Sequence, residues 1–97
     1  MAERKKKLPP THPGELLLEE IMPAAGLSQG RLAELLGVSR LTISEIVTEK
    51  RGVSADMAHR LARLFKTSPD LWLALQTDVD LWNAHQKKKA EYEDQTD

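Results

Sequence analysis

The sequence predicts an all-α fold with five helices in one small domain. Apolar residues recur at helical spacing in five stretches, a serine stands directly before four of them, and no stretch alternates apolar and polar residues as a strand does. The chain has 97 residues, of which 40% are hydrophobic and 30% charged. This balance is ordinary for a globular protein, and the length fits a single domain with a modest core.

The first helix is expected to begin at Pro13, after a basic tail over residues 1–10. Proline is favoured at the first helical position because its missing N–H would have no partner there. Glu15 follows in the first turn, where the helix dipole favours an acid. We expect Pro23 to end this helix and Ala24-Ala25-Gly26 to turn the chain.

The second and third helices are predicted as a closely joined pair. Ser28 is a suitable N-cap for a helix over residues 29–36, and Ser39 for a helix from Arg40 to about Thr48. Gly37 stands between them, where a left-handed residue ends a helix and permits a sharp turn.

The fourth helix is expected to begin after Ser54 and to end at Phe65, following a loop at 50–52. Ser68-Pro69-Asp70 combines an N-cap, a first-position proline and an early acid, so it predicts the start of a fifth helix that passes Trp72 and Trp82. The pattern leaves open a break near 77–78. We expect the domain to occupy residues 11–84, with a polar, frayed tail over 85–97.

Two short helices joined by a tight glycine turn form a helix-turn-helix, a motif that places its second helix in the major groove of DNA. Ala33 is small where the two helices would cross, while Ile43 and Ile46 would tie the second helix to the core. The alternative is a hairpin that only builds a core, and the coincidence of these residues with Gln29 and Gly37 at the motif's spacing weakens it. The predicted DNA-binding residues are Gln29, Arg31, Ser39, Arg40, Leu41, Thr42, Ser44, Glu45, Lys50 and Arg51.

These residues divide into readers of bases and binders of phosphate. The exposed side chains at the start of the second helix of the pair would reach base edges. Gln29 and Arg31, at the start of the preceding helix, and Lys50 and Arg51, in the following loop, would lie along the phosphate backbone.

Charge is distributed unevenly along the chain. Residues 28–66 carry seven basic and four acidic side chains, whereas residues 67–97 carry three basic and seven acidic ones. A basic middle and an acidic end indicate two surfaces with different partners. The alternative is an uneven but merely solvated surface. For the ERKKK run at 3–7 we prefer a solvated terminus to an arm that follows phosphates.

The fifth helix has more apolar faces than one neighbour can cover, which predicts a homodimer. Pairing would also suit DNA binding, because two recognition helices read a palindrome. The alternative is that one small core absorbs every apolar side chain. The predicted dimerisation residues are Leu71, Trp72, Leu75, Val79 and Trp82.

Several classes of function are disfavoured by the sequence. There are no cysteines, no apolar run approaches the ~20 residues of a membrane span, and the basic start lacks the apolar core of a signal peptide. His12, His59 and His85 are scattered and fit structural or solvated histidines better than metal ligands. We therefore expect no enzyme activity, no metal and no cofactor.

Four stretches of the sequence carry a resemblance to a known family: HPGELLLEE (12–20), GLSQGRLAELLGVSRLTISEIV (26–47), KRGVSADMAHRLARLF (50–65) and TSPDLWLALQTDVDLW (67–82). On these stretches the sequence resembles the HigA-type (VapI-like) antitoxins, a branch of the Xre/Cro repressor group, over residues 11–84. The resemblance implies a lambda-repressor-like domain that binds a palindromic double-stranded operator as a homodimer. It further implies that the protein neutralises a HigB-type messenger-RNA-cleaving toxin and represses its own operon. The lack of cysteines fits a protein of the reducing cytoplasm. Ser44-Glu45 follow the group's pattern, whereas Leu41 is apolar where a polar reader is more usual and suits a thymine methyl.

Two other hypotheses remain beside the antitoxin. One is a stand-alone Xre-type regulator without a toxin partner, and the other is a helical adaptor that binds only protein. A toxin that holds RNA needs a cationic surface, so the acidic residues of 67–97 or of the first helix are the expected places for it.

Overall fold

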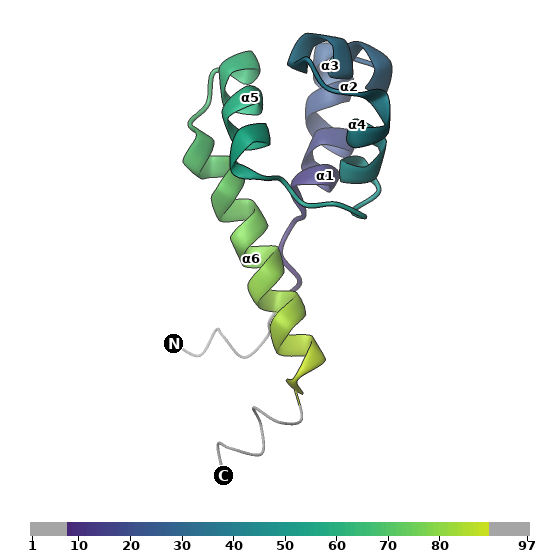
Figure 1. Ribbon diagram of the computed structural model, residues 1–97. Helices are drawn as coiled ribbons and strands as arrows, with labels where there is room; N and C mark the ends of the chain where they lie inside the picture. Colours follow the sequence, from purple (N-terminus) through teal and green to yellow (C-terminus); the bar gives the residue numbers. More distant parts are fainter. Residues whose placement is uncertain (1–7, 90–97) are drawn as a thin grey trace.

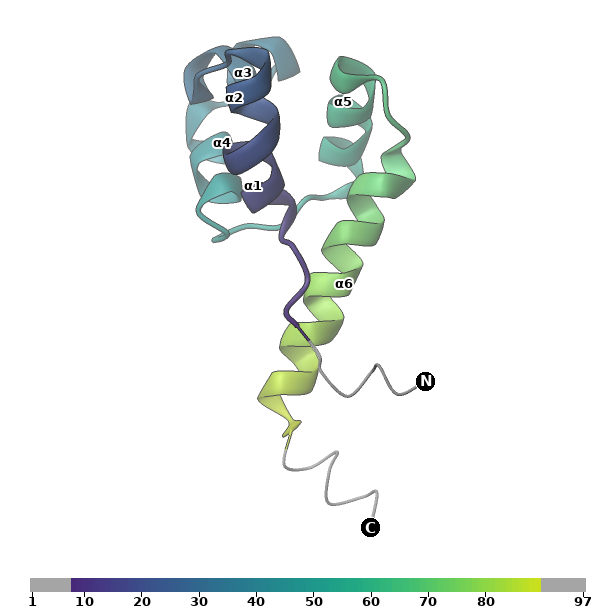
Figure 2. The same cartoon turned by 180° about the vertical axis from the view of Figure 1, so that it is seen from behind.

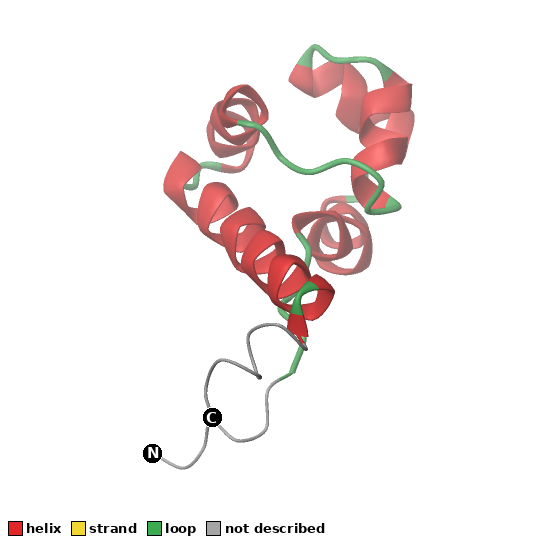
Figure 3. Cartoon of the chain, turned by 60° about the horizontal axis from the view of Figure 1, so that its bottom comes forward, coloured by secondary structure: helices red, strands yellow, loops and turns green. Residues whose placement is uncertain are grey.

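The computed structural model describes residues 8–89, and its regular structure over that range is helical throughout (Figure 1, Figure 3). The predicted all-α fold with five helices is confirmed. The helical segments are α1 (Pro13–Leu16), a π-helical turn (Leu17–Ile21), α2 (Met22–Ala25), α3 (Gln29–Leu36), α4 (Arg40–Val47), α5 (Ala55–Phe65) and α6 (Pro69–Lys87). The first three follow one another without a gap and form a single first helix.

This first helix contradicts the expectation that Pro23 ends it. Pro23 lies inside α2, and the helix ends only at Gly26, which is left-handed with φ 68°. The π-helical turn explains the difference, because its N–H groups bond five residues back, as Met22 does to Leu17. The wider turn shifts the preceding carbonyl groups out of α-helical register, in which the ring of Pro23 would clash with the carbonyl of Glu19.

The predicted caps and the turn of the helix pair are confirmed. In each of the four later helices a serine side chain accepts a hydrogen bond from the N–H three residues on, which satisfies a donor that the helix itself leaves unpaired. Gly37 is left-handed with φ 74°, and its N–H bonds back to Ala33. The capping pairs are Ser28 with Arg31, Ser39 with Thr42, Ser54 with Met57 and Ser68 with Leu71.

One core lies between the helices. Ala33 is buried where α3 meets α4, and Ile43 and Ile46 turn inward from α4 as expected. Removing such side chains from water supplies the main stabilisation of a small helical domain, at about 25 cal/mol per Å² of apolar surface. The largest fully buried side chains are Trp72, Leu17, Leu32, Ile43, Ile46, Leu61 and Pro13.

Trp72 belongs to this core and not to a dimer surface. Its side chain is 0% exposed, its indole N–H donates to Thr67 Oγ1 at 2.9 Å, and its ring lies 6.5 Å from that of Phe65. The indole thus buries its apolar body and still satisfies its one donor. The expectation that Trp72 anchors a dimer is therefore wrong, because no part of this side chain reaches the surface.

The start of the first helix packs directly against the end of α4. A Cβ atom on Gly14 would lie 1.8 Å from the carbonyl oxygen of Ile46, so the approach requires a residue without a side chain. His12 precedes this contact, is buried, and accepts a hydrogen bond from the N–H of Gly14 at Nδ1, 2.9 Å away. The histidine has the structural role expected for it, and the HPGE stretch has a physical explanation.

The last helix, α6, is continuous past Thr77 and Asp78 and extends beyond the other helices (Figure 1). It ends at Lys87, three residues past the predicted domain boundary, while residues 1–7 and 90–97 of the predicted tails lie outside the described range. The described N-terminal segment runs beside α6 in both Figure 1 and Figure 2. No helix within 8–89 is long and apolar enough to cross a membrane.

Candidate nucleic-acid interface

The exposed face of α4 carries the side chains predicted to read bases. The side chain of Arg40 is exposed and forms no hydrogen bond or ion pair within residues 8–89, and Leu41 is 65% exposed. Ser44 and Glu45, one turn further on, are half-buried. The opposite face is held in the core by Ile43, so α4 presents a fixed surface, and the guanidinium group at its start has no partner in the described part of the chain.

Ser39 and Thr42 are engaged with each other at the first turn of α4. Ser39 Oγ accepts from the N–H of Thr42 at 3.1 Å and lies 2.9 Å from Thr42 Oγ1. Both residues were predicted to contact DNA, and Ser39 remains exposed while Thr42 is half-buried. Their hydroxyl groups first serve to fix the start of the helix that presents Arg40.

The start of α3 carries the side chains that were predicted to contact phosphate. Ser28 caps this end, Gln29 is half-buried and Arg31 is exposed. Arg31 Nη1 lies 3.0 Å from Glu34 Oε1, in a pair whose side chains are both more than half exposed. Such a solvated pair is weak and is readily exchanged for another anion.

The loop after α4 folds back on the helix and brings Lys50 and Arg51 beside it. Glu49 takes a left-handed conformation with φ 64°, and the N–H groups of Lys50 and Arg51 both bond to the carbonyl oxygen of Glu45. Arg51 also donates from Nε and Nη2 to Glu45 Oε1, at 2.9 and 2.6 Å. Glu45 is therefore neutralised by Arg51, whereas the ammonium group of Lys50 has no partner within the described residues.

Sequence reasoning missed two side chains that hold this surface in place. Arg60 of α5 donates from Nη1 to the carbonyl oxygen of Leu36 at 2.8 Å, at the turn of the motif. Gln76 of α6 accepts from the N–H of Val53 at 2.9 Å, just after the loop. The position of Gln76 on the face of α6 that carries the buried Trp72 was an available signal, because a polar residue on a buried face needs a polar partner.

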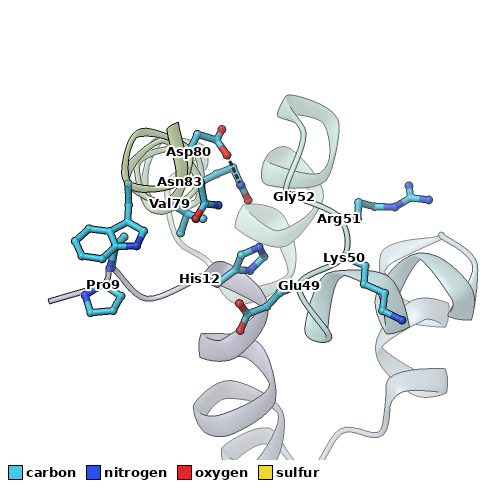
Figure 4. Close-up of a pocket in the computed structure, with 12 residues that line it drawn as sticks. Pro9, His12, Glu49, Lys50, Arg51, Gly52, Val79, Asp80 and Asn83 are labelled. Atoms are coloured by element: carbon cyan, nitrogen blue, oxygen red, sulfur yellow. Dashed lines mark hydrogen bonds between the residues drawn. The ribbon is translucent and has the colours of Figure 1, made fainter. Parts of the chain in front are cut away.

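Two clefts adjoin these elements. One, of about 340 Å³, lies between the N-terminal segment, the loop and α6, and Figure 4 shows His12, Gly52 and Asp80 around it. The other, of about 490 Å³, lies between the end of α3 and α5 and includes Leu35 and Arg63. In neither, nor elsewhere among residues 8–89, do three or more His, Asp or Glu side chains gather as they would around a metal ion.

The outer face of α6 exposes a second surface, which is apolar. Leu71 is 44% exposed and Leu81 is 65% exposed, while Leu75 and Trp82 are half-buried. Val79 is only 8% exposed and contributes chiefly to the inner side of the helix. Of the predicted dimerisation residues, Leu71, Leu75 and Trp82 thus share an accessible stripe, and sequence reasoning missed Leu81, which extends it.

The family to which these features point is found by comparison with known proteins. A family model described as helix-turn-helix matches residues 18–72. Virulence-associated protein I of Dichelobacter nodosus is 46% identical over 86 residues, which cover 89% of this chain and 80% of that protein. Antitoxin HigA-1 of Vibrio cholerae is 36% identical over 89 residues, which cover 91% of this chain and 83% of that protein.

A solved structure agrees in fold as well as in sequence. It is that of the Pseudomonas aeruginosa antitoxin HigA with the higBA promoter, which is 43% identical to this chain with a TM-score of 0.82. The match covers 87% of this chain and 91% of that one. The shared motif is a DNA-binding element and not a catalytic one. The chain therefore belongs to the helix-turn-helix family, and within it to the HigA-type antitoxins.

Proposed function

We propose that this protein is an antitoxin that binds operator DNA in front of its own gene as a homodimer, represses its own operon, and neutralises a HigB-type messenger-RNA-cleaving toxin. The observation that carries the DNA-binding part is the guanidinium group of Arg40, which is exposed at the start of α4 and has no partner among residues 8–89, while the other face of that helix is held by the core. The HigA relative bound to its promoter supports it. The proposed role as a repressor of its own operon assigns the protein to the cytoplasm.

The base contacts are assigned to the first turns of α4. Arg40 has five donors in a fixed fork and suits the two acceptors that guanine presents in the major groove. Leu41, which is 65% exposed and apolar, suits the methyl group of thymine. Ser44 lies one turn further on, and its hydroxyl group can form a hydrogen bond with more than one kind of base edge.

The phosphate contacts are assigned to Gln29 and Arg31 on one side of α4 and to Lys50 and Arg51 on the other. These side chains do not read sequence, and they fix the position of α4 on the duplex. Arg51 approaches a phosphate while it is still held by Glu45, so its guanidinium group is oriented in advance.

The dimer is assigned to the outer stripe of α6, formed by Leu71, Leu75, Leu81 and Trp82. Water-exposed leucines in a row along one helix are stabilised when a second copy covers them. Two copies related by a two-fold axis would read the two halves of a palindrome.

The toxin is assigned to the acidic side chains away from α4. Glu15, Glu19 and Glu20 are all exposed on the first helix, where they leave Arg40 free for DNA. Asp78 is exposed on α6, whereas Asp80 is engaged by Gln76, and four further acids of the C-terminal segment lie outside the described residues. The first helix is therefore the better of the two surfaces for a cationic partner.

The test has two parts that separate the DNA from the toxin. A gel shift with the DNA upstream of the gene, repeated at rising salt, should show specific binding that weakens steeply as phosphate contacts are screened. Absence of a specific shift would refute the repressor. Co-purification with the product of the adjacent small gene tests the toxin, with charge reversal at Glu19 and Glu20 compared with reversal at Asp78 and Asp80. If no adjacent product binds, the protein is a stand-alone regulator.

A further inference from the structure

Gln76 connects the long helix α6 to the loop that follows α4. Its Oε1 atom accepts from the N–H of Val53 at 2.9 Å, between residues 23 positions apart in the chain. Its Nε2 atom donates to Asp80 Oδ1 at 3.0 Å, one turn further along α6. Because the oxygen and the nitrogen of the amide group each have a partner, the orientation of the Gln76 side chain is fixed, and so is its distance from the loop.

Gly52 allows this connection. A Cβ atom at this position would lie 2.8 to 2.9 Å from the amide group of Gln76, closer than real Cβ contacts come. The backbone of Gly52 is not left-handed, so conformational freedom is not what requires glycine here. The requirement comes from Gln76, which occupies the space that a side chain would take.

The loop is thus fastened at two places, on α4 and on α6. Arg51 is bound to Glu45 on α4 and Val53 to Gln76 on α6, with Gly52 between them. Figure 4 shows the side chains of Lys50 and Arg51 projecting away from α6, on the far side of the loop from Asp80. The position of the loop backbone that carries Lys50 and Arg51 is therefore fixed by α6, which lies on the side of the loop opposite to these two side chains.

We propose that Gln76 is a positioning residue for DNA binding, which fixes the loop of residues 50–52 so that Lys50 and Arg51 meet the phosphate backbone together with α4. The proposal rests on the proposed DNA-binding function. Lysine and arginine side chains are long and rotatable, and a fixed backbone beneath them reduces the entropy lost on contact with phosphate. Since α6 is also the proposed dimer helix, Gln76 links the state of α6 to the affinity for DNA.

The experiment measures operator affinity by fluorescence anisotropy at several salt concentrations. Gln76→Ala is made in the intact protein and in a Lys50→Ala/Arg51→Ala background, with Thr77→Ala, an exposed neighbour on α6, as the matched control. We expect Gln76→Ala to weaken binding about 2- to 12-fold, the range of one hydrogen bond, and to flatten the salt dependence. We expect no change from Thr77→Ala, and no further loss from Gln76→Ala once both loop cations are gone.

Three results would overturn the proposal, and each of them would identify a different premise as wrong. An equal loss in both backgrounds would mean that Gln76 acts on the fold as a whole. No loss in the intact protein, while Lys50→Ala/Arg51→Ala still weakens binding, would refute the role of Gln76 and leave the phosphate contacts standing. No loss from Lys50→Ala/Arg51→Ala itself would refute the phosphate contacts on which the role depends.

A second variant keeps the test decisive if Gln76→Ala folds poorly by circular dichroism. Gly52→Ala inserts the Cβ atom that conflicts with Gln76 and leaves every polar group in place. Alone it should displace Gln76 and weaken operator binding, and Gly52→Ala/Gln76→Ala should bind more tightly than the two separate losses would give if added. Strict additivity would show that the contact between the two residues does not matter for DNA binding.

Discussion

Arg60 Nη1 lies 2.8 Å from the carbonyl oxygen of Leu36 and thereby joins α5 to the last turn of α3. The same guanidinium group donates from Nε to Asp56 Oδ2 at 2.8 Å, which orients it along α5. Carbonyl groups in the last turn of a helix have no partner within the helix, and Arg60 supplies one from outside. The turn at Gly37 is therefore held by a residue that lies 24 positions from Leu36 in the chain.

Arg60→Ala should lower the free energy of unfolding by about 1–2 kcal/mol, because a charge-assisted hydrogen bond to a partly buried carbonyl is lost. Arg63→Ala is the matched control: Arg63 is exposed on the same helix and has no side-chain partner among residues 8–89. Its effect should stay within about 0.5 kcal/mol. Urea unfolding followed by circular dichroism makes the comparison, and equal effects of the two substitutions would contradict the role of Arg60.

Gly14→Ala should destabilise the fold by at least about 1–3 kcal/mol, the usual range for overpacking, because its Cβ atom would collide with the backbone of Ile46. Gly30→Ala, in α3, is the opposite case. Apart from the two chain neighbours and the backbone of its own helix, nothing lies within 4 Å of a Cβ atom there, so Gly30→Ala should be neutral or stabilising by up to about 1 kcal/mol. Thermal unfolding of the two variants shows whether each substitution lowers or raises the stability of the fold. If Gly14→Ala did not lower it, the first helix would not approach the backbone of α4 as closely as the structure indicates.

Leu81→Asp should convert the proposed dimer to a monomer, because it places a charge in the apolar stripe of α6. Ala84→Asp, exposed on another side of the same helix, should leave the dimer intact. Light scattering at micromolar concentration distinguishes one chain of 10.9 kDa from twice that mass. A wild-type protein that is already monomeric would refute the dimer. A dimer that persists in Leu81→Asp would mean that the interface lies on another surface of the protein.

Lys50→Ala should weaken binding to operator and to unrelated DNA alike and flatten the salt dependence by about one phosphate contact. The reason is that Lys50 is exposed, has no partner within the described residues, and can neutralise a phosphate but not identify a base. Anisotropy titrations with both DNAs at two salt concentrations give the slopes. Loss of operator binding alone would mean that Lys50 reads sequence.

The helices could be predicted because their signals are local. Ser28, Ser39, Ser54 and Ser68 cap the helices that they were expected to cap, and Gly37 takes the expected left-handed conformation. Pro23 was misjudged, since the π-helical turn that accommodates it has no recognised mark in the sequence.

What remained hidden in the sequence concerns contacts between distant residues. Trp72 was expected outside and is in the core, because which side of an amphipathic helix faces inward depends on the partner helices. Three contacts join separate elements and are not predicted by the spacing of residues along the chain. They are the contacts of Arg60 with Leu36, Gln76 with Val53 and Gly14 with Ile46. The pairing of Glu45 with Arg51 likewise follows from the shape of the loop.

The most direct test of DNA reading by α4 is methylation interference on the DNA upstream of the gene. Methylation of guanine at N7 in the major groove blocks any protein that uses this acceptor. For the wild-type protein we predict interference at guanines placed symmetrically in two half-sites, and for Arg40→Ala the disappearance of one guanine from each half-site, with about 1–3 kcal/mol of affinity lost. An interference pattern that Arg40→Ala leaves unchanged in a folded protein, or no guanine interference at all, would contradict the reading of bases by α4.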